Sequence, residues 1–168
     1  MCRELTSGYL ARRLKPSWLS KNGNNIIIST AAFDLRDGDP PELFVSFYLT
    51  GNCNPIDFSY ALELIKKGYR DSNVSGAICI LNIEEALREV NDEQDPIIVF
   101  YELIDSPHSG LFFTKNKEEK QELIQEAKTT LCFLARKRIQ AIKENIALEY
   151  EIPKIEVLTN PVLLTSKS

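Results

Sequence analysis

The residues of this chain that could do chemistry are few. The sequence contains no GxxxxGK[ST] or GxGxxG phosphate loop, no HExxH metal helix and no GxSxG nucleophile turn. The only histidine, His108, lies in the loop segment SPHSG, and no nucleophile is marked by its context for a Ser-His-Asp triad. A surface position without a chemical role is therefore the simpler interpretation of His108. The remaining candidates are Arg12, Arg13, Ser29, Thr30 and Glu102.

Three short motifs resemble a set of small uncharacterised bacterial proteins. The matching positions are an RxxP motif from Arg13 to Pro16, the SxAAF motif from Ser29 to Phe33, and a serine-containing strand from Phe44 to Phe47. The resemblance covers roughly the first third of the chain. It implies relatedness and brings no defined activity with it.

A second resemblance is to the ADP-ribosyltransferase fold, and it depends on the chain order Arg12 or Arg13, Ser29 with Thr30, and Glu102. It implies an enzyme acting on a nicotinamide dinucleotide such as NAD. The cation would meet the phosphates, the hydroxyls would order the nicotinamide pocket, and the carboxylate would stabilise a cationic sugar. Ala31 stands where the family has a third hydroxyl, and no ExE or QxE motif surrounds the glutamate. In the alternative interpretation, the hydroxyls hydrogen-bond at a strand end and Arg13 is a surface charge.

Length and composition predict one globular domain, residues 1–168, with residues 159–168 as a frayed tail. At 168 residues, 43% of them hydrophobic, the chain can bury a core without metals or disulfides. No apolar run approaches the roughly 20 residues of a membrane helix, and no secretory signal follows the first charges. We therefore expect a cytoplasmic protein that does not enter membranes.

Cysteines and charges exclude two further classes of function. Cys2, Cys53, Cys79 and Cys132 are far apart and lack the close pairing of zinc ligands, so we expect no metal and no disulfide, with Cys79 and Cys132 buried. The net charge of −4 gives no general attraction to nucleic acid. Residues 1–22 are mainly basic and residues 84–95 mainly acidic, which fits two solvated faces.

The hydrophobic pattern predicts strands and short helices in the first two thirds of the chain. Strands 26–33 and 43–49, joined by the polar segment DLRDGDPPE, are expected to be neighbours. Residues 4–14 fit either a helix or a strand. Helices are expected over 55–67, capped by Asn54, and after Asn82 with Glu85 completing the cap. Strands are expected at 74–81, at 111–114 and at 97–103, the last in a central position.

A long third helix is the element that suggests a function. Its predicted cap is Asn116, and an apolar seam from Leu123 continues through Ile139, Ile142 and Ile146. Residues 117–148 would then span about 45 Å, which is more than a domain of this size needs to cover. A last strand is expected within 154–158.

These elements predict an α+β fold with a single mixed or antiparallel sheet of about five strands, covered by three helices. Since no catalytic motif is evident, we expect a non-enzymatic interaction or accessory module. It would bind a protein partner or self-associate through helix 117–148, without a cofactor.

Overall fold

The computed structural model describes residues 2–23, 25–51, 57–68, 74–116, 118–142 and 157–158, the last two by their backbone alone. Within these ranges there are three α-helices, an eight-stranded sheet and a separate two-stranded hairpin. The helices are α1 (Phe58–Gly68), α2 (Ile83–Val90) and α3 (Gln121–Arg136). The strand order of the large sheet is β1 (Cys2–Leu5), β7 (Ile98–Leu103), β8 (Ser109–Phe113), β5 (Val45–Gly51), β2 (Tyr9–Leu14), β6 (Gly76–Asn82), β9 (Ile139–Ile142) and β10 (Val157–Leu158). The α+β prediction is confirmed, with more strands than the expected five.

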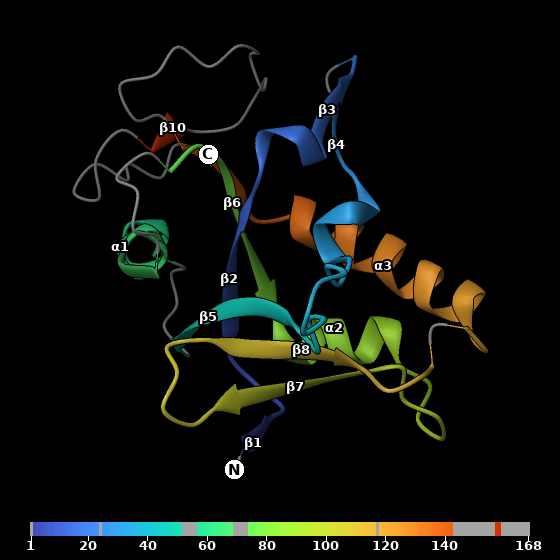
Figure 1. The fold of residues 1–168 in the computed structure, drawn as a ribbon. Coiled ribbons are helices and arrows are strands. Elements are labelled where there is room, and N and C mark those ends of the chain that lie inside the picture. The colour runs from blue at the N-terminus through green and yellow to red at the C-terminus, as the bar shows by residue number, and fades with distance from the viewer. Residues whose placement is uncertain are drawn as a thin grey trace.

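Strand β5 joins two halves of the large sheet. Its first residues, Val45–Phe47, pair with β8, whereas its later residues pair with β2, with Tyr48 opposite Ala11. Pairing is antiparallel throughout except between β9 and β10. In Figure 1, β2 and β6 run across the direction of β5, β8 and β7. The sheet therefore turns sharply at β5.

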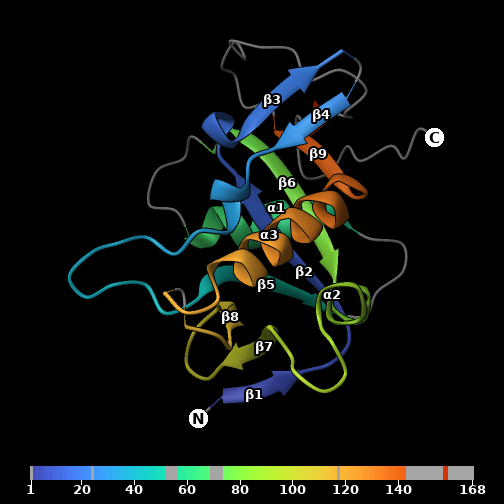
Figure 2. The same cartoon turned by 90° about the vertical axis from the view of Figure 1, so that its right-hand side faces the viewer.

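The helices cover opposite faces of the half formed by β2 and β6. Helices α2 and α3 lie on one side of these strands and α1 lies on the other (Figures 1 and 2). Successive residues of a strand point to opposite faces. Accordingly, Cys79 and Leu81 of β6 belong to the core beneath α3, whereas Ile78 and Ile80 belong to the core beneath α1. Strand β6, which matches the strand expected at 74–81, is thus buried on both faces.

The predicted helix over residues 117–148 is wrong. Helix α3 ends at Arg136. In the turn that follows, the Lys137 amide donates to the Leu134 carbonyl and the Arg138 amide donates to the Ala135 carbonyl. Residues 139–142 then form β9, paired with β6. Ile139 and Ile142 share the helical spacing of the preceding seam, but isoleucine is β-branched and suits a strand. Ile146, which would continue the seam, lies outside the described residues.

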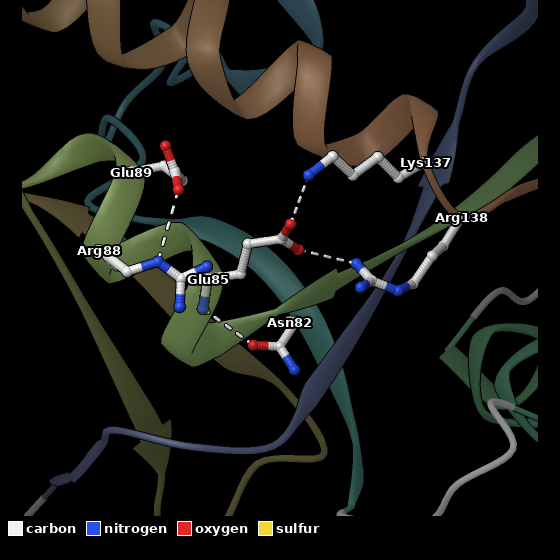
Figure 3. Close-up of polar contacts among 6 residues, drawn as sticks. All are labelled: Asn82, Glu85, Arg88, Glu89, Lys137 and Arg138. Carbon is white, nitrogen blue, oxygen red and sulfur yellow. Dashed lines mark hydrogen bonds and ion pairs between the residues drawn. The ribbon is translucent and has the colours of Figure 1, made fainter.

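A charge cluster holds this turn in place. Lys137 Nζ and Arg138 Nη1 donate to the two carboxylate oxygens of Glu85, at 2.5 and 2.9 Å (Figure 3). Glu85 is on the first turn of α2, and its backbone amide donates to Asn82 Oδ1 at 2.9 Å, as the predicted cap requires. The cluster therefore connects the start of α2 to the end of α3.

Three other expectations are corrected. Strand β4 (Asn25–Ile28) ends early and pairs with β3 (Leu19–Asn22), not with β5, because residues 30–33 form a 3₁₀ turn, η2 (Thr30–Phe33). Strand β7 is next to the edge strand β1 and is not central. Asn116 heads a turn, accepting from the Glu118 amide, and α3 begins later, at Gln121.

Several of the other expected helices and strands are present in the described residues. Residues 4–14 contribute to strands β1 and β2, which settles the ambiguity of that segment. Helix α1 starts at Phe58, and the preceding Asp57 accepts a hydrogen bond from the Tyr60 amide through its Oδ1. The predicted cap Asn54 and the predicted tail 159–168 lie outside the described residues. Strand β8 corresponds to the strand expected at 111–114, and β10 falls within 154–158. None of the described helices has the length and apolar character needed to span a bilayer.

Truncating one buried leucine on each face tests the two cores. Leu62 in α1 is 1% exposed and Leu131 in α3 is fully buried, so changing either to alanine should lower the free energy of unfolding by about 2–5 kcal/mol. Phe133, on α3 but 58% exposed, is the matched control, and Phe133→Ala should cost less than about 1 kcal/mol. Urea denaturation measures all three. Equal losses for Leu131→Ala and Phe133→Ala would contradict the assigned helix face.

The Glu85 cluster predicts a pH-dependent contribution to stability. Hydrogen bonds from Lys137 and then Arg138 hold the pKa of Glu85 below its ordinary value of 4.5, against the opposing effect of burial. The contribution is therefore present above about pH 4.5 and is lost as the pH falls through the lowered pKa of the folded state. Glu85→Gln should lower the melting temperature at pH 7, and the gap from wild type should shrink below pH 4. Glu89→Gln, a more exposed change on the same helix, should show no such convergence.

Candidate functional site

A cavity of about 510 Å³ lies where β2 and β5 separate. Pairing between the two strands stops at Ala11 and Tyr48, although β2 continues beside β6 as far as Leu14. The cavity is lined from both strands and from the segments around them. Its described lining residues are Arg12, Arg13, Lys15, Trp18, Ala31, Asp34, Arg36, Glu42, Val45, Ser46, Tyr48, Gly68 and His108. We call this space the fork cavity.

Arg12 bridges the two sides of the fork. Its Nε–H donates to the carbonyl of Ala32 at 3.0 Å, and Nη1 donates to the carbonyl of Ser46 at 2.7 Å. The guanidinium carbon also lies 5.3 Å from the centre of the Trp18 ring and 5.8 Å from that of Phe47. The Arg12 side chain therefore connects β2 to β5 at the point where the two strands no longer pair through their backbones. This structural role explains why Arg12 is partly buried.

Three further cations line the cavity from different segments. Arg13 follows on β2 and its Nε–H donates to the Ser75 carbonyl at 2.8 Å. Lys15 comes just after β2, with Nζ 5.1 Å from the centre of the Trp18 ring. Arg36 comes from the loop between η2 and β5. Arg12, Arg13 and Lys15 are close in sequence, and the fold brings Arg36 to them from a separate segment.

Both lining carboxylates have a cationic partner. Asp34 Oδ1 accepts from Lys128 Nζ of α3 at 2.5 Å. Glu42 accepts from the backbone amide of Arg36 at 2.8 Å and from its side-chain Nε–H at 2.6 Å. The side-chain hydrogen bond from Arg36 is the main cause that holds the pKa of Glu42 below its ordinary value, and Arg12 adds a smaller effect. Glu42 therefore stays ionised in neutral solution and closes the loop onto Arg36.

Aromatic rings form another part of the wall. The rings of Tyr48 and His108 lie 4.8 Å apart and are tilted by 52°. Tyr48 can reach this position because Gly68 has no side chain: a Cβ there would be only 1.8 Å from the tyrosine oxygen. Nδ1 of His108 is buried and has no hydrogen-bond partner. Since burial lowers the pKa of His108, its imidazole is neutral at pH 7.

Only part of the candidate set from the sequence reaches this cavity. Arg12, Arg13 and His108 line it, but Ser29, Thr30 and Glu102 are not among the described lining residues. Ser29 Oγ accepts from the Ala31 amide at the start of η2, and Thr30 Oγ1 accepts from the side chain of Gln125. Glu102 on β7 forms an ion pair with Arg3 on the neighbouring strand β1, with 2.5 Å between Oε2 of Glu102 and Nη2 of Arg3.

The arrangement expected from the ADP-ribosyltransferase resemblance is therefore not formed. Its arginine faces the fork cavity, whereas its glutamate is engaged elsewhere, and its first hydroxyl, Ser29, serves as a local cap. The interpretation of Ser29 as a hydroxyl that hydrogen-bonds at a strand end is correct, because it directly follows β4. Arg13 is a cavity residue and not a simple surface charge.

Sequence reasoning missed most of the cavity. Trp18, Arg36, Glu42 and Tyr48 had no motif around them, and Lys15 lies in the RxxP motif, which brought no activity with it. One signal was present: the only tryptophan of the chain follows three cations within the short segment RRLKPSW. That signal could have marked Trp18, whereas nothing local connects it with Tyr48.

Cys79 and Cys132 are not placed for nucleophilic chemistry. Burial raises the pKa of Cys79 to about 12 and that of Cys132 to about 11, so both thiols stay protonated. Both are buried, as predicted, while Cys53 lies outside the described residues. In the described ranges no three His, Cys, Asp or Glu side chains are grouped to hold a metal.

No protein family, curated protein or solved structure matches this chain. The two resemblances noted in the sequence therefore remain predictions, and the geometry of the fork cavity is the basis for assigning a function.

Replacing Arg12 tests its bridging role. Arg12→Lys keeps the charge but cannot present two donors from one planar group, so at least one buried carbonyl loses its partner. We expect a loss of about 1–3 kcal/mol in the free energy of unfolding, measured by urea denaturation. Arg88→Lys is the control, because Arg88 is exposed, forms an ion pair with the exposed Glu89 and should tolerate the change. Similar stability of both variants would show that the fork does not depend on Arg12.

Proposed function

We propose that this protein is a binding module that holds a small anionic ligand in the fork cavity. The observation that carries the proposal is the charge of the cavity wall. Among the lining residues that the structure describes, four are cations, Arg12, Arg13, Lys15 and Arg36, and two are carboxylates, Asp34 and Glu42, in a chain whose net charge is −4.

The excess of positive charge on the cavity wall has an energetic consequence. Like charges brought together at low dielectric repel one another, so gathering several cations at a concave surface opposes folding unless other contacts offset the repulsion. A bound anion would relieve that repulsion and gain charge-assisted hydrogen bonds. The carboxylate of Asp34 is already engaged by Lys128, which lies on α3 and is not among the described lining residues. Positive charge therefore predominates on the side formed by β2 and the residues that follow it.

A ligand in this cavity replaces the protein partner expected from the sequence. That expectation depended on a helix over 117–148 with an unfilled apolar seam. Helix α3 is shorter, and its apolar residues Ile124, Ala127, Leu131, Leu134 and Ala135 are buried within the same chain. The transferase alternative is not retained either, because Glu102 does not line the cavity.

Titration with simple oxyanions tests the proposal. Inorganic phosphate and sulfate, added at constant ionic strength, should raise the melting temperature because they bind the folded state only. Lys15→Gln removes one cavity charge and should weaken binding by about three- to tenfold, in line with the loss of one partly exposed charge contact. Lys21→Gln, at an exposed position on β3, removes the same charge elsewhere and should leave the affinity unchanged.

Two results would contradict the proposal. Oxyanions could stabilise the protein no more than chloride at equal ionic strength. Alternatively, Lys15→Gln and Lys21→Gln could weaken binding equally, which would indicate a general effect of net charge.

A further inference from the structure

We propose that the ligand of the fork cavity is an organic phosphate that carries a flat aromatic ring a few bonds from the phosphate, as a nucleoside monophosphate does. This inference rests on the proposed anion-binding function and specifies its ligand class. Three properties of the cavity support it: its volume, the kind of cations in its wall, and the distance between those cations and the aromatic residues.

The volume favours an organic ligand over an inorganic ion. About 510 Å³ is many times the roughly 30 Å³ that one water molecule occupies in the liquid, so a bare oxyanion would leave most of the cavity to solvent. Cavities of about 300–1,000 Å³ are typical of sites for organic ligands and cofactors.

The cations favour a phosphate group. Three of the four are arginines, whose planar guanidinium groups match the oxygens of phosphate. The four come from β2, from the residue that follows it and from the loop before β5, so they approach from more than one direction. A phosphomonoester presents three acceptor oxygens and carries a charge of about −1.5 to −2 at pH 7, whereas a carboxylate offers two oxygens in one plane.

The aromatic residues favour a ring next to that phosphate. Arg12 and Lys15 place their charges 5.3 and 5.1 Å from the centre of the Trp18 ring. An anion held by these cations is consequently within a few ångströms of the indole. A ligand that also uses the indole must keep its ring close to its phosphate, as an aryl phosphate or a nucleoside monophosphate can.

The wall is also rigid enough to receive a flat ring. The Trp18 amide donates to the Lys15 carbonyl at 3.0 Å, and the Trp18 carbonyl accepts from the Ser29 amide at 2.8 Å. Tyr48 and His108 are packed against each other, and the neutral imidazole adds a π surface without another positive charge. Stacking of bases on such side chains tolerates different rings, so the inference is to a ligand class and not to one base.

Three related compounds separate the two parts of the ligand: adenosine 5′-monophosphate, ribose 5-phosphate without the ring, and adenosine without the phosphate. Calorimetry should give the monophosphate an affinity at least about tenfold higher than that of either fragment. Because Trp18 is the only tryptophan of the chain, its fluorescence should change on binding of the monophosphate.

Trp18→Leu should reduce binding of the monophosphate to the level of ribose 5-phosphate, with the affinity for ribose 5-phosphate unchanged. Phe133→Leu, an aromatic change at an exposed site on α3, should leave both affinities as in wild type. Trp18→Phe keeps a ring and should retain most of the preference, which covers the case in which the leucine variant fails to fold.

The outcomes distinguish this inference from the function on which it rests. Equal affinities for the monophosphate and ribose 5-phosphate would overturn the aromatic ligand class and leave anion binding intact. A preference for the monophosphate without a change in Trp18 fluorescence, or one that survives in Trp18→Leu, would also overturn it. If neither phosphate binds, both proposals fail.

Discussion

The separation of β2 from β5 is the constraint on which the rest of the structure depends. Strand β5 pairs with β8 through Val45–Phe47 and with β2 only from Tyr48 onward, so the two halves of the sheet diverge at that point. Backbone groups at the divergence lose their strand partners, and a buried carbonyl without a partner is costly. The side chain of Arg12 donates to the Ser46 carbonyl of β5 and also to the Ala32 carbonyl of η2. Arg12 thus provides a hydrogen-bond partner for backbone groups at the turn of the sheet. The fork cavity is the space between the two strands after they diverge.

The walls of the cavity are held by contacts among the lining residues and with α3 behind them. Asp34 is held by Lys128 of α3, the loop after it is closed by Glu42 on Arg36, and His108 is packed on Tyr48. These contacts come from α3, from the loop before β5, and from β5 with the turn before β8. A site whose groups are already positioned loses less entropy when a ligand binds, which is the physical advantage of such an arrangement.

The local elements could be predicted from the sequence, whereas the cavity could not. Helix α2 begins where the Asn82 cap predicted, because a cap depends on residues within one turn. The helix expected to reach Leu148 failed because Ile139 and Ile142 fit a helical seam and a strand equally well, and their pairing with β6, some sixty residues earlier, decides between the two. The cavity combines β2 and β5 with residues from 15–18 and 31–42, Gly68 of α1 and His108, and no short motif contains that combination. Arg12, Arg13 and His108 were recognised as chemically capable residues, but the residues that surround them depend on strand pairing distant in the sequence.

The folded structure explains the uneven distribution of charge along the chain. Part of the acidic segment 84–95 is paired with cations from later in the chain: Glu85 with Lys137 and Arg138, and Asp95 with Lys115. The basic segment 1–22 behaves differently, because three of its cations, Arg12, Arg13 and Lys15, meet at the fork cavity. Net charge governs solubility and long-range attraction, whereas the field inside a cleft depends on the charges that line it. A chain with a net charge of −4 can therefore present a positive cavity, and the turn at β5 is what brings its cations together.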